Sequence, residues 1–265
     1  MKYAFLGAGK MASAIIQGML RAKMCGAEDI IAACPDAQML QGLQDSTAVR
    51  VTTSNEKAAK EAPTVLLCVK PQEAATAIEQ AGAGLEGKLL ISIAAGLTLG
   101  TLEKMAPRCR VIRAMPNTPA LVGCGATAFA TGPNTTGADE VSAEAIFASV
   151  GVVSQVQEKL LDAVTGLSGS GPAYIFLIIE ALTDGGVSCG LPSILARRLA
   201  IQTVLGAAEL AKETGEHPAI LREMVTSPGG TTAAALGELE QHGVRAAFIQ
   251  AVQAANRRSK ELSGE

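Results

Sequence analysis

Tyr3-Ala4-Phe5-Leu6-Gly7-Ala8-Gly9-Lys10-Met11-Ala12 begins as an apolar strand and continues into the pattern Gly-x-Gly-x-x-Ala. A helical pattern follows, so the glycines lie in a strand-to-helix turn. Gly7 would allow the tight turn, Gly9 would let the backbone approach a pyrophosphate, and Ala12 would let the helix pack closely on the strand. A plain tight turn is the alternative, but the position of the motif favours a dinucleotide site.

Short apolar runs alternate with helical patterns as far as residue 157. The runs predicted as strands are 3–6, 30–34, 64–69, 89–94, 111–114, 126–130 and 152–156. The helices predicted among them are 10–22, 36–44, 72–81 and 139–149. Nearly continuous apolar strands that alternate with helices indicate a mainly parallel sheet covered on both faces. The fold class is therefore α/β, with an N-terminal Rossmann dinucleotide-binding domain over residues 1–157.

From residue 158 onward the pattern is helical and no strand is predicted. The predicted helices are 173–185, 192–214, 218–224, 232–242 and 244–262. Apolar side chains nearly encircle the helix at 192–214, so this helix needs burial on most of its sides. We therefore predict an all-α dimerisation domain over residues 158–265, whose helices pack against those of a second copy. Coverage of these helices by the N-terminal domain is the alternative.

Composition excludes several classes of protein. Hydrophobic residues make up 48% of the 265 residues, charged residues make up 18%, and the net charge is −3. No basic run is interleaved with aromatic residues, so we expect no nucleic-acid partner. No apolar segment reaches about 18 residues without polar interruption, so we expect no membrane span. The two histidines leave little material for a His-based metal site, and no metal is expected.

The chain contains six cysteines but no Cys-x-x-Cys motif. They are scattered, and several lie inside apolar runs, which predicts small buried side chains in a reducing compartment. The sequence starts with a strand, so we expect no signal peptide before it. The predicted location is therefore cytoplasmic.

A second glycine turn, Thr226-Ser227-Pro228-Gly229-Gly230-Thr231-Thr232, precedes the helix predicted at 232–242. Its glycines would let successive N–H groups point into one hollow flanked by hydroxyl groups. The helix would direct its positive end at the same point. Such a turn would receive a small anion, and a carboxylate fits it. An ordinary helix cap is the alternative, because Pro-Gly and Thr are common at helix starts.

The end of the second predicted strand bears on the choice of dinucleotide. NAD sites usually carry Asp or Glu there, where the carboxylate binds the ribose hydroxyls. Here the strand ends at Cys34 and Asp36 comes only after Pro35, so no strand-end carboxylate would repel a 2′-phosphate. No Arg or Lys lies between Cys34 and Val49 to attract one. The sequence therefore favours NADP over NAD and predicts that NAD is tolerated.

Gly169-Ser170-Gly171 raises the alternative of a serine nucleophile, but it lacks the strand-to-helix elbow, and each histidine would come from a distant helix. A hydroxyacid dehydrogenase of similar plan would carry a catalytic Lys on the long helix, whereas 192–214 contains only Lys212 near its end. A nucleotide-sensing regulator without turnover would carry a binding extension, and none is recognised.

Taken together, these motifs resemble the pyrroline-5-carboxylate reductase family, which catalyses the last step of L-proline synthesis. The resemblance runs nearly end to end and rests on residues 7–12, 69–71, 94–96, 115–119, 162–174 and 227–232, with 218–240 similar to the signature segment of the family. It implies a Rossmann domain followed by a helical domain that dimerises by interleaving, and rings of dimers occur in this family. Family members often carry a polar residue where this chain has Met224.

The resemblance also implies roles for single residues. Those that would bind the cofactor are Leu6, Gly7, Ala8, Gly9, Lys10 and Met11 at the pyrophosphate, Cys34 and Asn55 at the adenosine ribose, and Cys68, Val69, Lys70, Pro71, Ile93, Ala94 and Ala95 at the nicotinamide. Those that would bind the substrate are Ser227, Gly229, Gly230, Thr231 and Thr232 at its carboxylate, with Glu158 near its ring. Thr165 and Ser168 would be catalytic, facing the ring nitrogen.

The chemistry of C=N reduction agrees with these residue types. A ring imine protonates readily, and the iminium is the better hydride acceptor. Positioning therefore supplies much of the catalysis, and no strong side-chain acid is required. The partners expected are a small molecule with a carboxylate and a ring imine, and a second copy of the chain.

Overall fold

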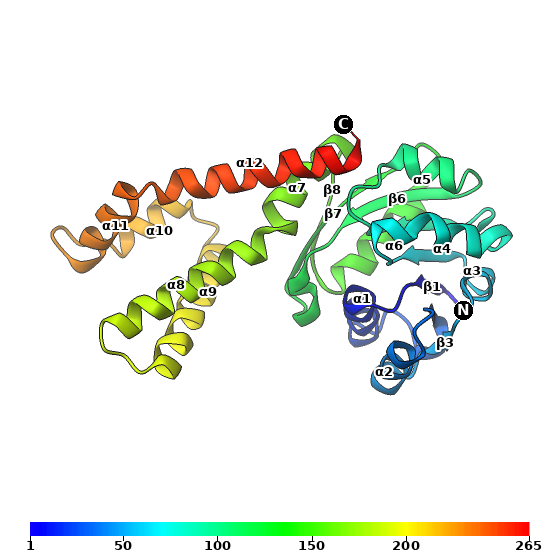
Figure 1. The fold of residues 1–265 in the computed structure, drawn as a ribbon, viewed down its shortest axis with the longest axis horizontal. Coiled ribbons are helices and arrows are strands. Elements are labelled where there is room, and N and C mark those ends of the chain that lie inside the picture. The colour runs from blue at the N-terminus through cyan, green and yellow to red at the C-terminus, as the bar shows by residue number, and fades with distance from the viewer. Residues whose placement is uncertain (265) are drawn as a thin grey trace. The chain divides into compact units, whose positions relative to one another are not determined.

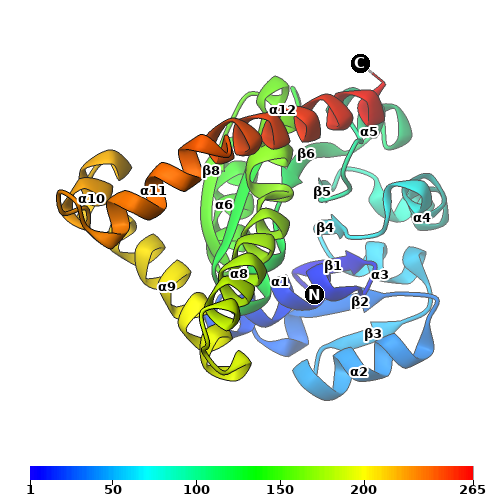
Figure 2. The same cartoon turned by 60° about the vertical axis from the view of Figure 1, so that its left-hand side comes forward.

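The computed structural model describes residues 1–264; residue 265, the last of the predicted helical domain, lies outside them. Within the described residues, eight strands form one sheet in the order β3-β2-β1-β4-β5-β6-β7-β8 (Figures 1 and 2). The strands are β1 (Tyr3–Leu6), β2 (Ile30–Ala33), β3 (Arg50–Thr52), β4 (Thr64–Leu67), β5 (Leu89–Ser92), β6 (Arg110–Met115), β7 (Gly125–Thr131) and β8 (Gly151–Gln155). All neighbouring strands are parallel except β6 and β7, which confirms the predicted mainly parallel sheet.

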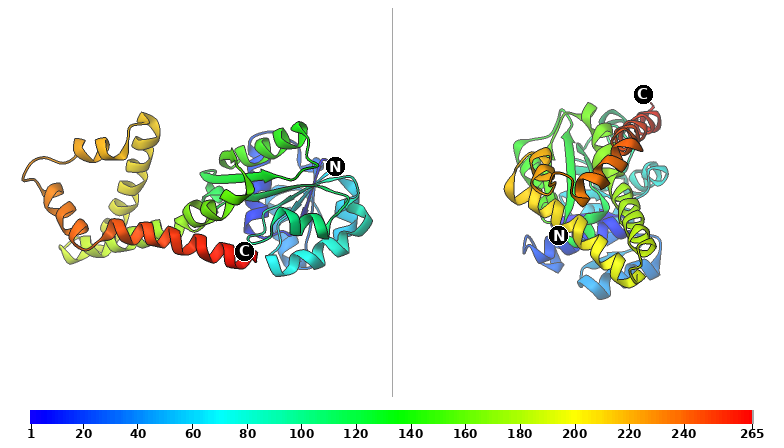
Figure 3. Two further views of the ribbon diagram at one scale, coloured as in Figure 1. Left: turned by 90° about the horizontal axis from the view of Figure 1, so that it is seen from above. Right: turned by 90° about the vertical axis from the view of Figure 1, so that its left-hand side faces the viewer.

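Helices cover both faces of this sheet (Figure 3). Successive strand residues point to opposite faces, so Phe5 joins one apolar core and Leu6 the other. The helices that pack on the Phe5 face are α1 (Lys10–Arg21), α2 (Ala37–Thr47) and α6 (Gly137–Ala148). Those on the Leu6 face are α3 (Asn55–Glu61), α4 (Ala74–Ala81), α5 (Leu99–Met105) and α7 (Leu161–Val164). The N-terminal part is thus a Rossmann-like domain.

Short turns of helix connect these elements. They are the 3₁₀ segments Ala27–Asp29, Pro71–Glu73, Gly82–Leu85, Thr118–Val122 and Glu158–Leu160, and one π-helical segment, Thr165–Gly169. The π-helical turn follows α7 directly. Such turns occur frequently at functional sites, and this one contains both predicted catalytic residues.

The remaining helices are α8 (Gly171–Ser188), α9 (Ser193–Thr214), α10 (Pro218–Met224), α11 (Thr231–Gln241) and α12 (Val244–Ser263). No strand lies between residues 158 and 264, as predicted. The chain divides into two compact units, one of residues 1–170 with 254–264 and one of residues 171–253. The functional boundary between residues 157 and 158 stays a prediction.

Most predicted elements are confirmed within a few residues, but four strands or α-helices are absent from the prediction. These are β3, α3, α5 and α7. β3 is only three residues long and carries the polar Arg50 and Thr52, so it has no apolar run. α3 has the sequence Asn-Glu-Lys-Ala-Ala-Lys-Glu, in which only Ala58 and Ala59 are buried. Neither element has the periodicity by which strands and helices are recognised.

One continuous helical stretch, Glu158–Ser188, is long and apolar enough to cross a membrane by length and composition alone. The sequence analysis did not identify this stretch, because Ser168, Ser170, Glu180 and Thr183 interrupt its apolar residues. Only 11% of its most apolar window is buried. The apolar side chains of α8 therefore require a covering surface, for which an interface helix is as good an explanation as a membrane.

Candidate active site

A cavity of about 540 Å³ lies at the carboxyl ends of β1, β2 and β4. Ligands of open α/β sheets bind at this end of the strands. The predicted cofactor residues that line it are Gly7, Ala8, Gly9, Cys34, Asn55, Cys68, Val69 and Lys70. The structure therefore brings together residues from four separate turns of the Rossmann domain.

Seven predicted cofactor residues do not line this cavity. Leu6 is fully buried in β1, and Lys10 lines a separate hollow between α1 and α2. Met11 packs on the apolar cores, and Pro71 begins the 3₁₀ turn before α4. Ile93, Ala94 and Ala95 follow β5, where the Ala94 N–H donates to the Ser92 hydroxyl (3.3 Å). Their contact with a cofactor stays a prediction.

Gly7 is required by the fold itself. Its φ of +106° is a conformation that L side chains rarely adopt, and an added Cβ would lie 2.7 Å from the Cys68 carbonyl oxygen. The chain is tied on both sides of this turn, because the Gly7 N–H donates to Ala33 (2.8 Å) and the Cys68 N–H donates to Leu6 (2.8 Å). The glycine therefore permits β1 and β4 to approach closely where the cavity begins.

Gly9 is not required by the fold. Its backbone is extended (φ −71°, ψ 179°), and an added Cβ would meet no atom within 4 Å. It precedes α1, whose first N–H groups have no side-chain cap. An open cradle at an uncapped helix N-terminus fits the pyrophosphate of a dinucleotide, which would occupy the space of a Cβ.

Cys68 lines this cavity, and its buried thiol is a neutral group. Burial raises its pKa far above the ordinary value for a cysteine, so it stays protonated at neutral pH. A neutral thiol neither repels a pyrophosphate nor acts as a nucleophile. Cys68 therefore serves as a small wall residue of the cavity.

The predicted catalytic hydroxyls lie in the π-helical turn that follows α7. Thr165 Oγ1 donates to the Leu161 carbonyl (2.8 Å), and Ser168 Oγ donates to the Val164 carbonyl (3.1 Å). Each hydroxyl proton is thus directed back into the helix. The oxygen lone pairs are left to accept a hydrogen bond from another group.

Asn117 anchors this turn to the sheet. Its Nδ2 donates to the Ser168 carbonyl (3.0 Å), while its Oδ1 accepts from the Ala126 N–H (2.8 Å) at the start of β7. The side chain is buried, so both bonds are shielded from water. Asn117 lies in a motif that the sequence had indicated only through the family resemblance.

A buried ion-pair network holds the segment that leads into the turn. Arg113 of β6 is 5% exposed, and its guanidinium contacts Glu158 Oε1 (3.1 Å) and Asp162 Oδ1 (3.8 Å). Glu158 Oε1 also accepts from the Leu99 N–H (2.6 Å), and Asp162 Oδ1 accepts from the Ser259 hydroxyl (2.6 Å). Sequence reasoning missed this network. Arg113, which lies inside an apolar strand, could have predicted it, because a charged side chain that is buried is normally paired with an opposite charge.

The turn before α11 belongs to the second unit, and the Gly230 N–H, one of its predicted anion donors, is bonded within the turn. The Gly230 N–H donates to the Ser227 carbonyl (3.0 Å), with Pro228 and Gly229 between them, and Gly229 has a φ of +68°. Pro followed by a glycine of positive φ is typical of a type II turn. The helix begins at Thr231 after Gly230, without a side-chain cap. The interpretation of Thr as an ordinary helix cap is therefore wrong, and the first N–H groups of α11 are available to an anion.

Two family models match the chain. The model described as pyrroline-5-carboxylate reductase dimerisation matches residues 158–262, and the model described as NADP oxidoreductase, coenzyme F420-dependent, matches residues 2–96. The pyrroline-5-carboxylate reductase of Synechocystis sp. is 49% identical over 97% of this chain and 96% of that protein. The reductase of Arabidopsis thaliana is 45% identical over 99% and 95%.

The chain belongs to the pyrroline-5-carboxylate reductase family. Solved structures agree with this membership. A pyrroline-5-carboxylate reductase from Coxiella burnetii is 38% identical, with a TM-score of 0.93 over 99% of this chain and 98% of that chain. The pyrroline carboxylate reductase of Plasmodium falciparum, with NADP bound, is 34% identical, with a TM-score of 0.90 over 99% and 98%. The family membership confirms the resemblance on which the site residues were assigned.

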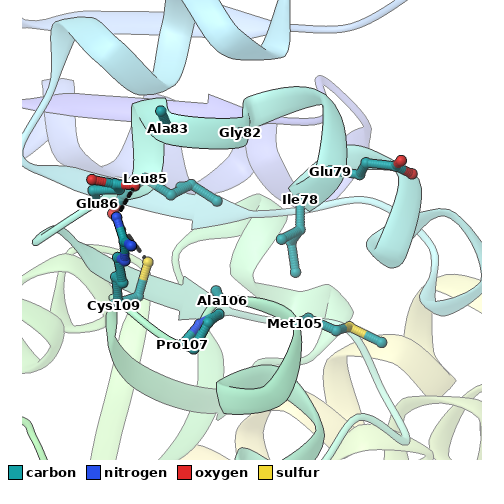
Figure 4. A pocket seen from close by; sticks show the side chains of 11 residues that line it. Ile78, Glu79, Gly82, Ala83, Leu85, Glu86, Met105, Ala106, Pro107 and Cys109 are labelled. Carbon is teal, nitrogen blue, oxygen red and sulfur yellow. Dashed lines mark hydrogen bonds and ion pairs between the residues drawn. The ribbon is translucent and has the colours of Figure 1, made fainter.

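In this member of the reductase family, a second cavity of about 270 Å³ lies at the other end of the strands (Figure 4). Its walls come from the residues that precede β5 and β6, with Leu85 and Met105 among them. Cys109 donates its thiol proton to the Leu85 carbonyl (3.1 Å), and burial raises the pKa of Cys109 to about 11. None of the predicted site residues lines this cavity, so it is separate from the cofactor site.

Proposed function

We propose that this protein reduces 1-pyrroline-5-carboxylate to L-proline by hydride transfer from NADPH, with NADH tolerated, as the last step of proline biosynthesis in the cytoplasm. Membership of the reductase family over nearly the whole chain carries this proposal. All six cysteines are free, which agrees with a reducing compartment. No nucleic acid or membrane takes part in the proposed activity.

The Rossmann domain would hold the cofactor, which supplies the hydride when bound. The turn at Gly7–Gly9 would bind the pyrophosphate at the N-terminus of α1. Cys34 and Asn55 would border the adenosine ribose, since they follow the neighbouring strands β2 and β3. The residues after β4 and β5 would line the nicotinamide side.

The turn before α11 would bind the substrate carboxylate. The N–H groups of Thr231 and Thr232 open this helix, and the hydroxyl groups of Ser227, Thr231 and Thr232 flank it. Each charge-assisted hydrogen bond to a carboxylate contributes about 1.5–3 kcal/mol. Two or three such bonds would fix the acid end of the substrate without an arginine.

The Thr165 hydroxyl would orient the ring nitrogen. Its proton is donated to Leu161, so its oxygen accepts the N–H of the iminium. The hydride adds to the ring carbon of the C=N bond, the electron pair of that bond moves to nitrogen, and the nitrogen keeps its proton. Ser168 stays a second candidate for the same contact. The predicted contact of Glu158 with the substrate remains open, since its Oε1 already accepts from two donors.

Replacing Thr165 with alanine is expected to lower kcat/KM about 10- to 150-fold, the loss of one hydrogen bond to a charged group. Thr165→Ser keeps the hydroxyl and should stay within about threefold of the wild type. Thr214→Ala is the matched control, because Thr214 makes the same bond to Leu210 (2.8 Å) on α9. Steady-state kinetics measure all three. Equal activity of the alanine variant and the wild type would remove this role.

The activity itself is tested by the loss of NADPH absorbance when 1-pyrroline-5-carboxylate is added. Proline must appear in equal amount. Oxidation of NADPH with a 2-oxo acid instead would favour the hydroxyacid dehydrogenase. Cofactor binding without turnover of either compound would favour the nucleotide-sensing regulator.

Self-association is indicated by the dimerisation model that matches residues 158–262. The second unit supports it, because Leu177 of α8 is 64% exposed and Ile194 of α9 is 87% exposed. Side chains of α8, α11 and α12 also form an apolar hollow of about 750 Å³. We propose that the same helices of a second copy cover these side chains in a homodimer, and that dimers assemble further into a ring.

Leu177→Asp should convert this assembly to monomers at micromolar concentration, since a buried unpaired carboxylate in an apolar interface costs several kcal/mol. Sedimentation velocity measures the mass. Val141→Asp is the control, because Val141 is an exposed apolar residue of α6 in the first unit. An unchanged mass for the Leu177 variant would contradict the interface.

A further inference from the structure

Asp36 lies in the cofactor cavity, although it comes after the end of β2. It precedes α2, and its Oδ1 accepts from the N–H groups of Gln38 (2.9 Å) and Met39 (3.0 Å). These bonds fix the carboxylate at the helix start. Its Oδ2 makes no hydrogen bond or ion pair within residues 1–264, so one carboxylate oxygen is left to face a ligand. β2 therefore ends without a carboxylate, as the sequence indicated, but Asp36 borders the cavity from the loop that follows.

The charges around the cavity are unequal at its two ends. Lys70 is the only Lys or Arg among the described lining residues. It follows β4, and Glu73, whose Oε2 accepts from the Lys70 N–H (3.3 Å), lines the cavity at the same end. Asp36 follows β2, and β1 lies between the two strands. Two strand spacings separate them, about 10 Å. Asn55, which also lines the cavity, donates its amide to Gln80 (2.9 Å). Among the described lining residues, no Lys or Arg therefore follows β2 or β3, the strands at the end that would take the adenosine ribose.

We propose that Asp36 narrows the preference of this protein for NADPH over NADH by favouring the unphosphorylated ribose. This inference rests on the proposed function, in which the adenosine ribose lies at the end of β2. The fixed carboxylate accepts a hydrogen bond from a ribose hydroxyl and repels a 2′-phosphate. NADPH remains a donor, but Asp36 limits its advantage over NADH.

Asp36→Asn tests the inference with a change of charge and almost none of shape. Asparagine caps helices as well as aspartate, so α2 is retained. The Kd of NADPH, measured by isothermal titration, should fall about five- to tenfold, because Coulomb repulsion at an exposed site is only partly screened. The Kd of NADH should stay the same or rise. Adenosine 2′-monophosphate should bind the variant more tightly, as NADPH does, whereas the affinity for AMP should not increase.

Asp45→Asn is the matched control. Asp45 is exposed on the same helix, bonds to Gln41 (2.7 Å) and does not line the cavity, and its replacement changes the net charge equally. Equal shifts of the ratio of the NADPH Kd to the NADH Kd in both variants would show an effect of net charge and overturn the proposal. An unchanged ratio in both variants would overturn it as well. The shift should also shrink between about 0.01 M and 0.15 M salt, as the Debye length falls from about 30 to 8 Å.

The same measurements separate this inference from the proposed function. Binding that shifts as expected, without turnover of 1-pyrroline-5-carboxylate, leaves the inference standing and removes the function. Turnover of 1-pyrroline-5-carboxylate, with the ratio of the NADPH and NADH Kd values unchanged in Asp36→Asn, removes the inference alone. Failure of every nicotinamide dinucleotide to bind removes both.

Discussion

Replacing Gly9 with alanine is expected to weaken NADPH binding about a hundredfold and to leave the protein about as stable as before. The fold does not oppose the new methyl group, because an added Cβ meets nothing within 4 Å and the backbone of Gly9 (φ −71°, ψ 179°) suits alanine. The methyl group instead fills the cradle of the pyrophosphate and denies it the N–H groups of α1. Loss of one or two charge-assisted bonds at 1.5–3 kcal/mol each accounts for the hundredfold.

Gly7→Ala is the informative contrast. Its φ of +106° and the Cys68 carbonyl 2.7 Å from the added Cβ should cost about 2–5 kcal/mol of unfolding free energy, in addition to the loss of binding. Urea denaturation and titration with NADPH measure the two effects separately. A Gly9 variant that binds NADPH like the wild type would show that the pyrophosphate lies elsewhere. A Gly9 variant as unstable as the Gly7 variant would show that the cradle is part of the fold.

The sequence predicted the elements whose apolar pattern is strong. β2, β4 and β5 are four-residue strands buried along their whole length, and their runs are visible without a structure. β3 was missed because it is an edge strand of three residues, and α3 because it carries mostly polar side chains. Their positions are set by pairing with β2 and packing on the sheet rather than by their own periodicity.

The two predicted anion sites share a local feature that a sequence can show. Gly9 and Gly230 each precede a helix that no side chain caps, whereas Asp36, Ser54 and Thr136 cap other helices with their own oxygens. Glycine before a helix leaves the first N–H groups to a ligand. Asp36 shows the limit of this reasoning. Its place in the cavity depends on how the loop after β2 turns, which the order of residues does not reveal.

The partners of the catalytic turn could not be predicted for a different reason. Arg113 and Glu158 are 45 residues apart in the sequence, and Asp162 and Ser259 are 97 apart. Only the folded chain brings them together, and no local pattern marks the pairs. The hydrogen bonds of Asn117 with Ser168 and Ala126 likewise follow no local sequence pattern. The hydroxyls were predicted, whereas the groups that position them were not.

Arg113→Met should lower the free energy of unfolding by about 3–5 kcal/mol, the cost of leaving the buried carboxylate of Asp162 without its cation. Asp162 is 3% exposed and would keep only the hydroxyl of Ser259 among its partners in the network. The helix that carries Glu158 and Asp162 leads directly into the turn of Thr165. We therefore expect kcat to fall even at temperatures where the variant is folded. Urea denaturation and steady-state kinetics measure the two effects.

Two further variants decide whether the buried charges are the cause. Arg108→Met removes a cation whose ion pair with Glu86 is exposed (73% and 51% of the two side chains), so it should cost less than about 1 kcal/mol. Adding Glu158→Gln and Asp162→Asn to Arg113→Met neutralises the abandoned carboxylates and should restore part of the stability. It should not restore kcat, because the triple variant still lacks the Arg113 guanidinium that fixes the segment leading into the turn. If the triple variant is no more stable than Arg113→Met alone, the loss comes from packing of the arginine stem rather than from unpaired charge.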